Sequence, residues 1–168
     1  IGIYGALKLS GEILIKSYSN VFGFDYTIVR PSALYGERCI SNRVLQIFLE
    51  NAFNKRKIKI LGDGKEKLDF TYIDDLCQGI YKIIKLRKKS QNEIFNLTYG
   101  SSRPILEIKE LIKKKFDKQI FLHQPRNKLT AIRGTLSIDK AKKVLGYQPK
   151  FNIIKGFQKY YNWYRDKF

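Results

Sequence analysis

Short β-rich runs and longer segments of helical periodicity alternate along the whole chain. Apolar residues recur at helical spacing in the longer segments, and β-branched and aromatic residues concentrate in the runs between them. This alternation predicts an α/β fold, because strands separated by helices pair into a sheet that those helices cover. We expect helices at 4–22, 42–54, 104–116, 137–145 and 153–166, a further helix that opens at Asp74, and strands at 24–29, 58–61, 68–73, 93–97 and 119–122.

Local signals mark the ends of several of these helices. Gly23 and Gly146 suit C-terminal stops, because glycine adopts the left-handed conformation at little cost. Ser41 is a candidate N-terminal cap for 42–54, and Pro104 suits the first turn of 104–116. Asp74 and its neighbour Asp75 would place two acids in a first turn, so we interpret both as structural rather than catalytic.

Composition narrows the class of protein. The chain has 168 residues, 43% of them hydrophobic, which is about one globular domain. No apolar run approaches the ~20 residues of a membrane span, and no signal peptide is visible, so we expect no membrane partner. Cys39 and Cys77 form neither a disulfide framework nor a metal-binding cluster, which favours the cytoplasm. His123 is the single histidine, so we expect it at the surface and expect no metal.

The net charge of +18 is large enough to attract nucleic acid, an anionic membrane surface or an anionic small substrate. The excess is mostly lysine and is scattered through an isoleucine-rich chain, as the bias of an AT-rich genome would produce. The densest clusters, at 87–89 and 113–115, fall at the ends of predicted helices, where cations complement the helix dipole. We therefore expect no nucleic-acid partner, although a basic nucleic-acid-binding domain stays open as an alternative.

Tyr4 and Lys8 are separated by one turn of the predicted first helix. Side chains at positions i and i+4 share a helix face, with Cβ atoms roughly 5–6 Å apart. A tyrosine in water titrates near pH ~10, and a neighbouring ammonium group favours the phenolate form. This spacing can therefore supply a proton-transfer group, although chance also produces it on solvated helices.

Five groups of residues occur in the order in which one family carries them, and together they span nearly the whole chain. The chain resembles the C-terminal part of the extended short-chain dehydrogenase/reductases, specifically the NAD-dependent epimerase/dehydratase group that acts on nucleotide sugars. The matching segments are Tyr4-Gly5-Ala6-Leu7-Lys8 (the family's Tyr-x-x-x-Lys), Arg30-Pro31-Ser32-Ala33-Leu34-Tyr35-Gly36 (its Arg-Pro-x-Asn-x-Tyr-Gly loop), Leu61-Gly62-Asp63-Gly64 with Asp69-Phe70-Thr71-Tyr72-Ile73-Asp74-Asp75, Phe95-Asn96-Leu97, and Lys140-Ala141 through Leu145-Gly146-Tyr147-Gln148-Pro149.

The resemblance implies hydride chemistry on a sugar ring. Tyr4 would take the proton of a sugar hydroxyl, and Lys8 would hold the ribose hydroxyls of NAD (or NADP). The residues that it implies for cofactor binding are Tyr4, Lys8, Pro31, Ser32 and Leu34. Those that it implies for binding a nucleotide-sugar substrate are Ala33, Arg43, Val44, Ile60, Leu61, Leu68 and Arg133.

Three positions depart from the family pattern. Ala33 stands where many members have Asn, Glu37 replaces the usual Pro, and Leu68 replaces an Arg that often contacts the substrate diphosphate. A leucine offers none of the donors of a guanidinium group, so another cation must serve or the substrate is atypical. Arg133 is the first candidate, with Arg43 and Arg126 behind it.

The implied architecture is the last part of a parallel Rossmann-type sheet plus a smaller α+β substrate domain. Residues 1–38 would end the NAD-binding domain, and 39–168 would form mainly the substrate domain, with 74–98 crossing back to the sheet. The family's glycine-rich phosphate turn and catalytic Ser/Thr have no counterpart in the chain, so we expect a fragment that is inactive alone. A homodimer is expected, with a role in polysaccharide biosynthesis. A relative that has lost catalysis and only binds its ligand stays open as the second alternative.

Overall fold

The structure is a computed structural model, and it describes residues 2–126 and 133–167. It opens with a long helix, α1 (Ile3–Phe22), which ends at Gly23 in the left-handed conformation, φ 71°. None of the side chains of α1 is buried, although the helix carries many large apolar residues. In this chain α1 therefore presents an apolar surface that no described segment covers.

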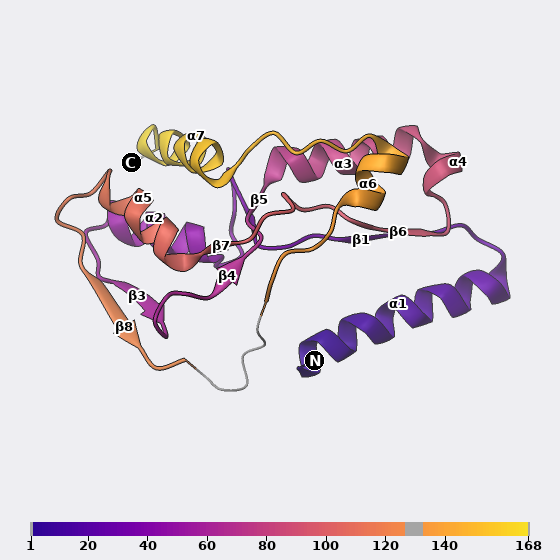
Figure 1. The fold of residues 1–168 in the computed structure, drawn as a ribbon, viewed down its shortest axis with the longest axis horizontal. Helices are drawn as coiled ribbons and strands as arrows, with labels where there is room; N and C mark the ends of the chain where they lie inside the picture. Colours follow the sequence, from indigo (N-terminus) through magenta and orange to yellow (C-terminus); the bar gives the residue numbers. More distant parts are fainter. Residues whose placement is uncertain (1, 127–132, 168) are drawn as a thin grey trace.

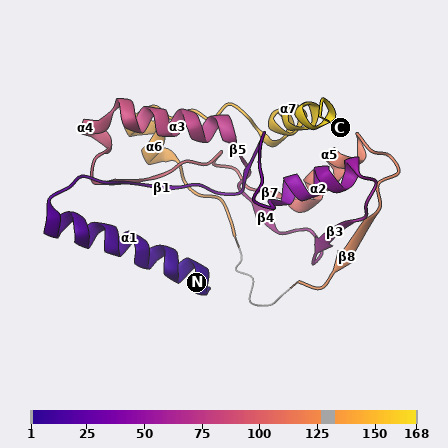
Figure 2. The ribbon, with the colours of Figure 1, turned by 180° about the vertical axis from the view of Figure 1, so that it is seen from behind.

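One parallel strand pair separates α1 from a second group of helices (Figures 1 and 2). The pair joins β1 (Thr27–Arg30) to β6 (Glu93–Asn96), with Thr27 opposite Glu93. Its other face carries α3 (Ile73–Lys85), the single turn α4 (Arg87–Ser90) and α6 (Asp139–Leu145). A hydrophobic cluster joins these elements and contains Leu76, Ile83, Phe95, Leu97, Ile138, Ala141, Leu145 and Tyr147.

Three more strand pairs build the other end of the molecule. Strand β2 (Leu34–Tyr35) pairs in parallel with β5 (Thr71–Tyr72), and β3 (Ile58–Leu61) pairs in parallel with β8 (Phe121–Gln124). Strand β4 (Lys67–Leu68) pairs antiparallel with β7 (Arg103–Pro104). The helices of this end are α2 (Val44–Phe53), α5 (Ile105–Lys113) and α7 (Ile153–Arg165), and they enclose the larger hydrophobic cluster. The expected α/β class is confirmed, while the proposed division into domains stays a prediction.

Some local expectations were wrong for identifiable reasons. The strand expected at 68–73 is interrupted, because the side chain of Asp69 turns inward and accepts hydrogen bonds from the backbone of Gly100 (3.1 Å) and Leu136 (3.4 Å). Ser41 does not cap α2, whose N-cap position is Arg43 without a side-chain bond. Pro104 lies one position earlier than expected, at the N-cap of α5. Gly146 ends α6 in the left-handed conformation, as predicted.

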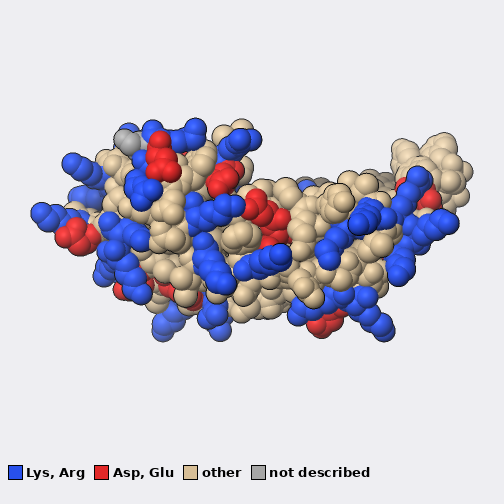
Figure 3. Space-filling model, turned by 90° about the horizontal axis from the view of Figure 1, so that it is seen from above, with Lys and Arg blue, Asp and Glu red and all other residues tan. Residues whose placement is uncertain are grey.

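Two observations concern the surface. In the described ranges, no helix is long and apolar enough to cross a membrane. On the face shown in Figure 3, Lys and Arg spread from one end of the molecule to the other, with acidic residues among them. This face therefore shows dispersed positive charge rather than one basic stripe.

Candidate active site

Tyr4 and Lys8 lie side by side on the first two turns of α1. The Nζ atom of Lys8 is 5.6 Å from the centroid of the Tyr4 ring, within the range of a cation–π contact. Tyr4 is 73% exposed, so its hydroxyl is open to solvent in this chain. The structure thus brings the two residues together as the spacing predicted, and their catalytic role stays a prediction.

An ion pair links α1 to the carboxyl end of β1. The guanidinium group of Arg30 donates two hydrogen bonds to the carboxylate of Glu12, at 2.7 and 2.5 Å. This paired geometry is the strong form of an Arg–carboxylate contact. It lowers the pKa of Glu12 below its ordinary value, mainly through the hydrogen bond from Arg30. Pro31 and Ser32 follow Arg30 directly, so this contact fixes α1 against the strand end from which they leave.

A cavity of about 200 Å³, which we call the arginine pocket, lies between β2, the start of α2 and β4. Two arginines, Arg43 and Arg133, line it together with apolar residues. Such a combination suits a ligand that has an anionic group next to an apolar or ring-shaped part, because guanidinium donors match phosphate oxygens. Its lining residues are Ala33, Leu34, Tyr35, Asn42, Arg43, Val44, Leu45, Leu68, Phe70 and Arg133.

A second cavity of about 320 Å³, the Leu61 pocket, lies around the turn that follows β3. Arg133 lines both cavities, so its side chain stands where the two meet. Arg126 also lines the Leu61 pocket and forms an ion pair of 3.2 Å with Glu66. The described residues of the Leu61 pocket are Leu61, Gly62, Asp63, Lys65, Glu66, Lys67, Arg126 and Arg133.

Most residues predicted to bind the substrate meet in these cavities. The arginine pocket contains Ala33, Arg43, Val44, Leu68 and Arg133, together with Leu34, which was predicted to bind the cofactor. Leu61 lines the second cavity. Sequence reasoning missed Asn42, Leu45 and Phe70 as lining residues and expected Tyr35 only to pack or bond locally, although each lies within two positions of a predicted residue.

Ile60 does not lie where it was predicted. Its side chain is 1% exposed, belongs to the larger hydrophobic cluster and lines neither cavity. Successive side chains of a strand point to opposite faces, so Ile60 and Leu61 in β3 face different sides. Strand alternation alone therefore predicts that Ile60 and Leu61 do not both face the same ligand.

A buried carboxylate holds the segment that carries Arg133. Asp69 is fully buried, and its Oδ2 atom accepts the backbone N–H of Leu136, three residues after Arg133. A second link joins the same segment to the β7 region, where the Thr135 hydroxyl bonds to that of Ser102 at 2.7 Å. The segment that carries Arg133 is therefore held in place by contacts of the residues that follow it.

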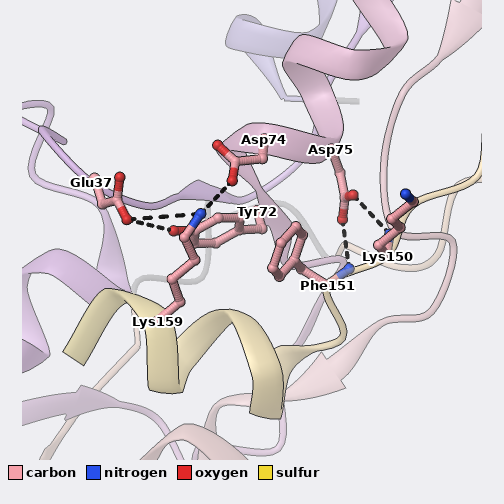
Figure 4. Close-up of polar contacts among 7 residues, drawn as sticks. All are labelled: Glu37, Tyr72, Asp74, Asp75, Lys150, Phe151 and Lys159. Carbon is pink, nitrogen blue, oxygen red and sulfur yellow. Dashed lines mark hydrogen bonds and ion pairs between the residues drawn. The ribbon is translucent and has the colours of Figure 1, made fainter. Parts of the chain in front are cut away.

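Another group of charged residues joins the start of α3 to α7 and to the segment that precedes α7 (Figure 4). Lys159 of α7 reaches the first turn of α3, where its Nζ atom lies 2.6 Å from the carboxylate of Asp74. That hydrogen bond is the main reason why the pKa of Lys159 is raised. Asp75 is buried and accepts the backbone N–H groups of Lys150 and Phe151, at 2.7 and 2.9 Å. Asp74 and Asp75 thus have structural contacts, as the sequence predicted.

Metal binding has no support in the described residues, which contain no group of His, Cys, Asp or Glu side chains suited to a metal ion. His123 is exposed, and its Nδ1 atom lies 2.9 Å from the carbonyl of Gly62. For a dinucleotide, the described chain offers Tyr4 and Lys8 but no glycine-rich phosphate turn. The residues present therefore fit one end of such a cofactor.

Comparisons with known proteins agree with this description. The family model "NAD dependent epimerase/dehydratase family" matches residues 1–98. The chain is 33% identical over 169 residues to UDP-glucuronate 4-epimerase of Thermodesulfobacterium geofontis, covering 97% of this chain and 50% of that protein. It is 25% identical over 165 residues to dTDP-glucose 4,6-dehydratase of Streptomyces antibioticus, covering 97% of this chain and 49% of that protein.

A solved structure shares the fold over nearly all of the chain. It is UDP-glucuronic acid 4-epimerase from Bacillus cereus in complex with UDP-glucuronic acid and NAD, with a TM-score of 0.90 at 26% identity. The match covers 98% of this chain and 53% of that structure. The chain spans about half the length of the curated relatives it matches. With a family model that matches more than half of its residues, the chain belongs to the NAD dependent epimerase/dehydratase family.

Proposed function

We propose that the chain forms the substrate-binding part of an NAD-dependent nucleotide-sugar epimerase or dehydratase and supplies its catalytic tyrosine and lysine. One observation carries the proposal: the arginine pocket gathers most of the residues that the family pattern assigns to the substrate, and two arginines line it. A nucleoside diphosphate would place its phosphates between Arg43 and Arg133. These two arginines would then replace the arginine that is missing at Leu68.

The chemistry of the proposed reaction begins with the oxidation of a sugar hydroxyl. Bound NAD would supply the hydride acceptor. Tyr4, as phenolate, would accept the hydroxyl proton, and the Lys8 ammonium group would stabilise that phenolate from one turn away. Lys8 would also hold the ribose hydroxyls of the cofactor. The positions of Tyr4 and Lys8 on one helix face support these roles.

The remaining part of the active site would come from outside these residues. Within the described chain, β1 has one neighbouring strand, β6, and its other edge is unpaired. In addition, α1 has no buried side chain. Together with the coverage of about half of each relative, this supports an additional α/β segment that would bind NAD phosphates. We therefore expect the 168 residues alone to lack turnover, and a homodimer stays an expectation.

The test uses the enzyme extended by the upstream part of its coding sequence and a panel of UDP-sugars and dTDP-sugars. We expect Tyr4→Phe to lower turnover by roughly 10²-fold or more, the range of general acid–base catalysis, with little change in UDP affinity. Tyr18→Phe is the matched control, because Tyr18 lies on the same helix and is 56% exposed. Unchanged turnover in Tyr4→Phe would show that the proposed chemistry is wrong.

Two alternatives have specific support. Ala33 and Leu68 favour a relative that binds a nucleotide sugar without turning it over. Such a protein would bind UDP but would show no turnover, with or without the Tyr4→Phe substitution. The net charge of +18 favours a nucleic-acid-binding domain. That domain would bind duplex DNA with an affinity that falls steeply with salt, because phosphate contacts release counterions.

A further inference from the structure

The loop of residues 36–43 connects two walls of the arginine pocket. It leaves the pocket after Tyr35, at the end of β2, and returns to it at Asn42 and Arg43, just before α2. Arg43 is one of the two cations that line the cavity. A shift of this loop would therefore move a charged side chain of the pocket.

This loop has little support from its own backbone. Arg38 and Asn42 both have left-handed conformations, with φ of 63° and 53°, which non-glycine residues adopt only at a cost. In the described part of the chain, no backbone–backbone hydrogen bond joins residues 37–42 to another segment. The loop thus depends on side-chain contacts to keep its shape.

Glu37 makes the polar contacts that tie the loop to other elements. Its Oε1 atom accepts a hydrogen bond of 3.2 Å from the Tyr72 hydroxyl and lies 4.0 Å from the Nζ atom of Lys159 (Figure 4). The other side-chain polar contacts described for this loop, at Cys39, Ser41 and Arg43, stay inside it. Among described residues, Glu37 is therefore the one polar anchor between residues 37–42 and the rest of the molecule.

The groups that hold Glu37 are themselves rigidly placed. Tyr72 is 0% exposed, and its ring packs 5.4 Å from that of Tyr35 and 4.8 Å from that of Phe151. Burial, followed by the negative charge of Glu37, raises the pKa of Tyr72, so its hydroxyl keeps the proton that it donates. Lys159, which is partly exposed, also donates a hydrogen bond to Asp74. Glu37 thus connects a strained loop to a packed part of the fold.

We infer that Glu37 is a positioning residue for the anionic ligand of the arginine pocket: bonded to Tyr72 and paired with Lys159, it holds the loop of residues 36–43 so that Arg43 lines the cavity. This inference rests on the proposed function, because it takes a nucleoside diphosphate as the ligand. It also gives a role to Glu37, which replaces the proline usual in the family.

A thiol-labelling experiment tests the anchor without any ligand. Cys39 lies in the loop and is half-buried, whereas Cys77 is exposed on α3. In a Cys77→Ser background, the rate at which Cys39 reacts with an aromatic disulfide reagent reports the opening of the loop. We expect Tyr72→Phe and Glu37→Ala to raise this rate roughly three- to tenfold, since each removes a partly exposed hydrogen bond of about 0.5–1.5 kcal/mol.

Tyr147→Phe is the matched control for Tyr72→Phe. The Tyr147 hydroxyl is buried and has no hydrogen-bond partner within the described residues, and Tyr147 lines neither cavity. Its removal should leave the Cys39 rate unchanged. A Tyr72→Phe variant that is folded, as shown by the fluorescence of the single Trp163, and that labels at the wild-type rate would overturn the anchor.

A calorimetric titration with UDP and with dTDP tests the consequence for binding, and it uses the enzyme extended by the upstream part of its coding sequence. We expect Tyr72→Phe and Glu37→Ala to weaken UDP affinity roughly three- to tenfold, and Glu37→Gln to weaken it less because it keeps the acceptor for Tyr72. In an Arg43→Ala background, Glu37→Ala should cause no further loss, because both changes act through the same contact. A merely structural role for Glu37 would make the two losses additive.

The outcomes separate the two proposals. If the folded, extended wild-type enzyme binds neither UDP nor dTDP, the proposed function fails, and the ligand part of this inference fails with it. If UDP binds and Glu37→Ala leaves its affinity unchanged, only the inference about Glu37 is wrong. If the losses of UDP affinity in Glu37→Ala and Arg43→Ala are additive, Glu37 does not position Arg43, and its removal destabilises the fold generally.

Discussion

The backbone of Gly156 in α7 presses against the phenol ring of Tyr35 in β2. A Cβ atom at Gly156 would lie 2.9 Å from Cζ of Tyr35 and would overlap its hydroxyl oxygen. The Tyr35 hydroxyl itself is buried and has no hydrogen-bond partner in the described part of the chain. The close approach therefore depends on the missing side chain of Gly156 and on packing rather than on a polar contact.

Gly156→Ala should destabilise the protein by about 1–3 kcal/mol, the usual cost of overpacking, even though alanine favours the helix by about 1 kcal/mol. Urea unfolding followed by Trp163 fluorescence measures this, because Trp163 lies on the same helix. Tyr35→Phe should be close to neutral and should reduce the loss caused by Gly156→Ala. Equal losses in both backgrounds would show that the hydroxyl is not the obstacle.

Ala33→Gly should stabilise the protein. Ala33 has a φ of 35°, and its Cβ disfavours this left-handed conformation, which glycine accepts. We expect a gain of about 0.5–1 kcal/mol in the free energy of unfolding, measured in urea. Ala52→Gly is the opposite control: Ala52 lies buried in α2, so the same change should destabilise by about 1 kcal/mol or more. Loss of stability in Ala33→Gly would contradict the assigned strain.

Asp75→Asn should be far more damaging than Asp74→Asn. The Asp75 carboxylate is buried and accepts two backbone N–H groups, whereas an asparagine would turn its own donor toward one of them. The expected loss is about 1–3 kcal/mol in the free energy of unfolding. Asp74 is half-exposed and pairs with Lys159, so its change should cost below about 1 kcal/mol. Similar losses at both positions would contradict this.

Acid should release α1 from β1. The pKa of Glu12 is lowered by its hydrogen bond from Arg30, so the folded state binds fewer protons there than the unfolded state. The resulting stabilisation is present above the unfolded value of about 4.3 and is lost as pH falls through the lowered folded value. Hydrogen exchange of the α1 amides, measured from pH 6 to pH 3, should lose protection at the acid end. Glu12→Gln should remove this pH dependence; if it does not, another group is responsible.

Hydrophobic periodicity and turn residues predicted the helices whose boundaries depend on neighbouring residues. Helix α7 (Ile153–Arg165) lies within a residue of its predicted bounds. Its apolar stripe lies within the helix, and the capping residue Asn152 lies directly before it. The interruption at Asp69 was not predictable, since its partners Gly100 and Leu136 are distant in sequence. Isolated runs of residues do not reveal which buried carboxylate will find backbone donors.

The site shows the same division. The family pattern predicted most of the lining of the arginine pocket, because each matching residue lies in a recognisable motif or within about eight residues of one. It misplaced Ile60, which strand alternation turns into the hydrophobic core. It identified Glu37 only as a departure, because the partners Tyr72 and Lys159 come together with it through the tertiary fold.

The contacts of α7 with Tyr35 and Glu37 set an order of assembly during synthesis. Residues 33–37 leave the ribosome before Gly156 and Lys159, which contact Tyr35 and Glu37 in the folded chain. The nascent chain must therefore keep this region without these contacts until α7 has also been synthesised. A premature stop codon just before Ile153 would remove none of the residues that line the arginine pocket and would still deprive the pocket of its backing.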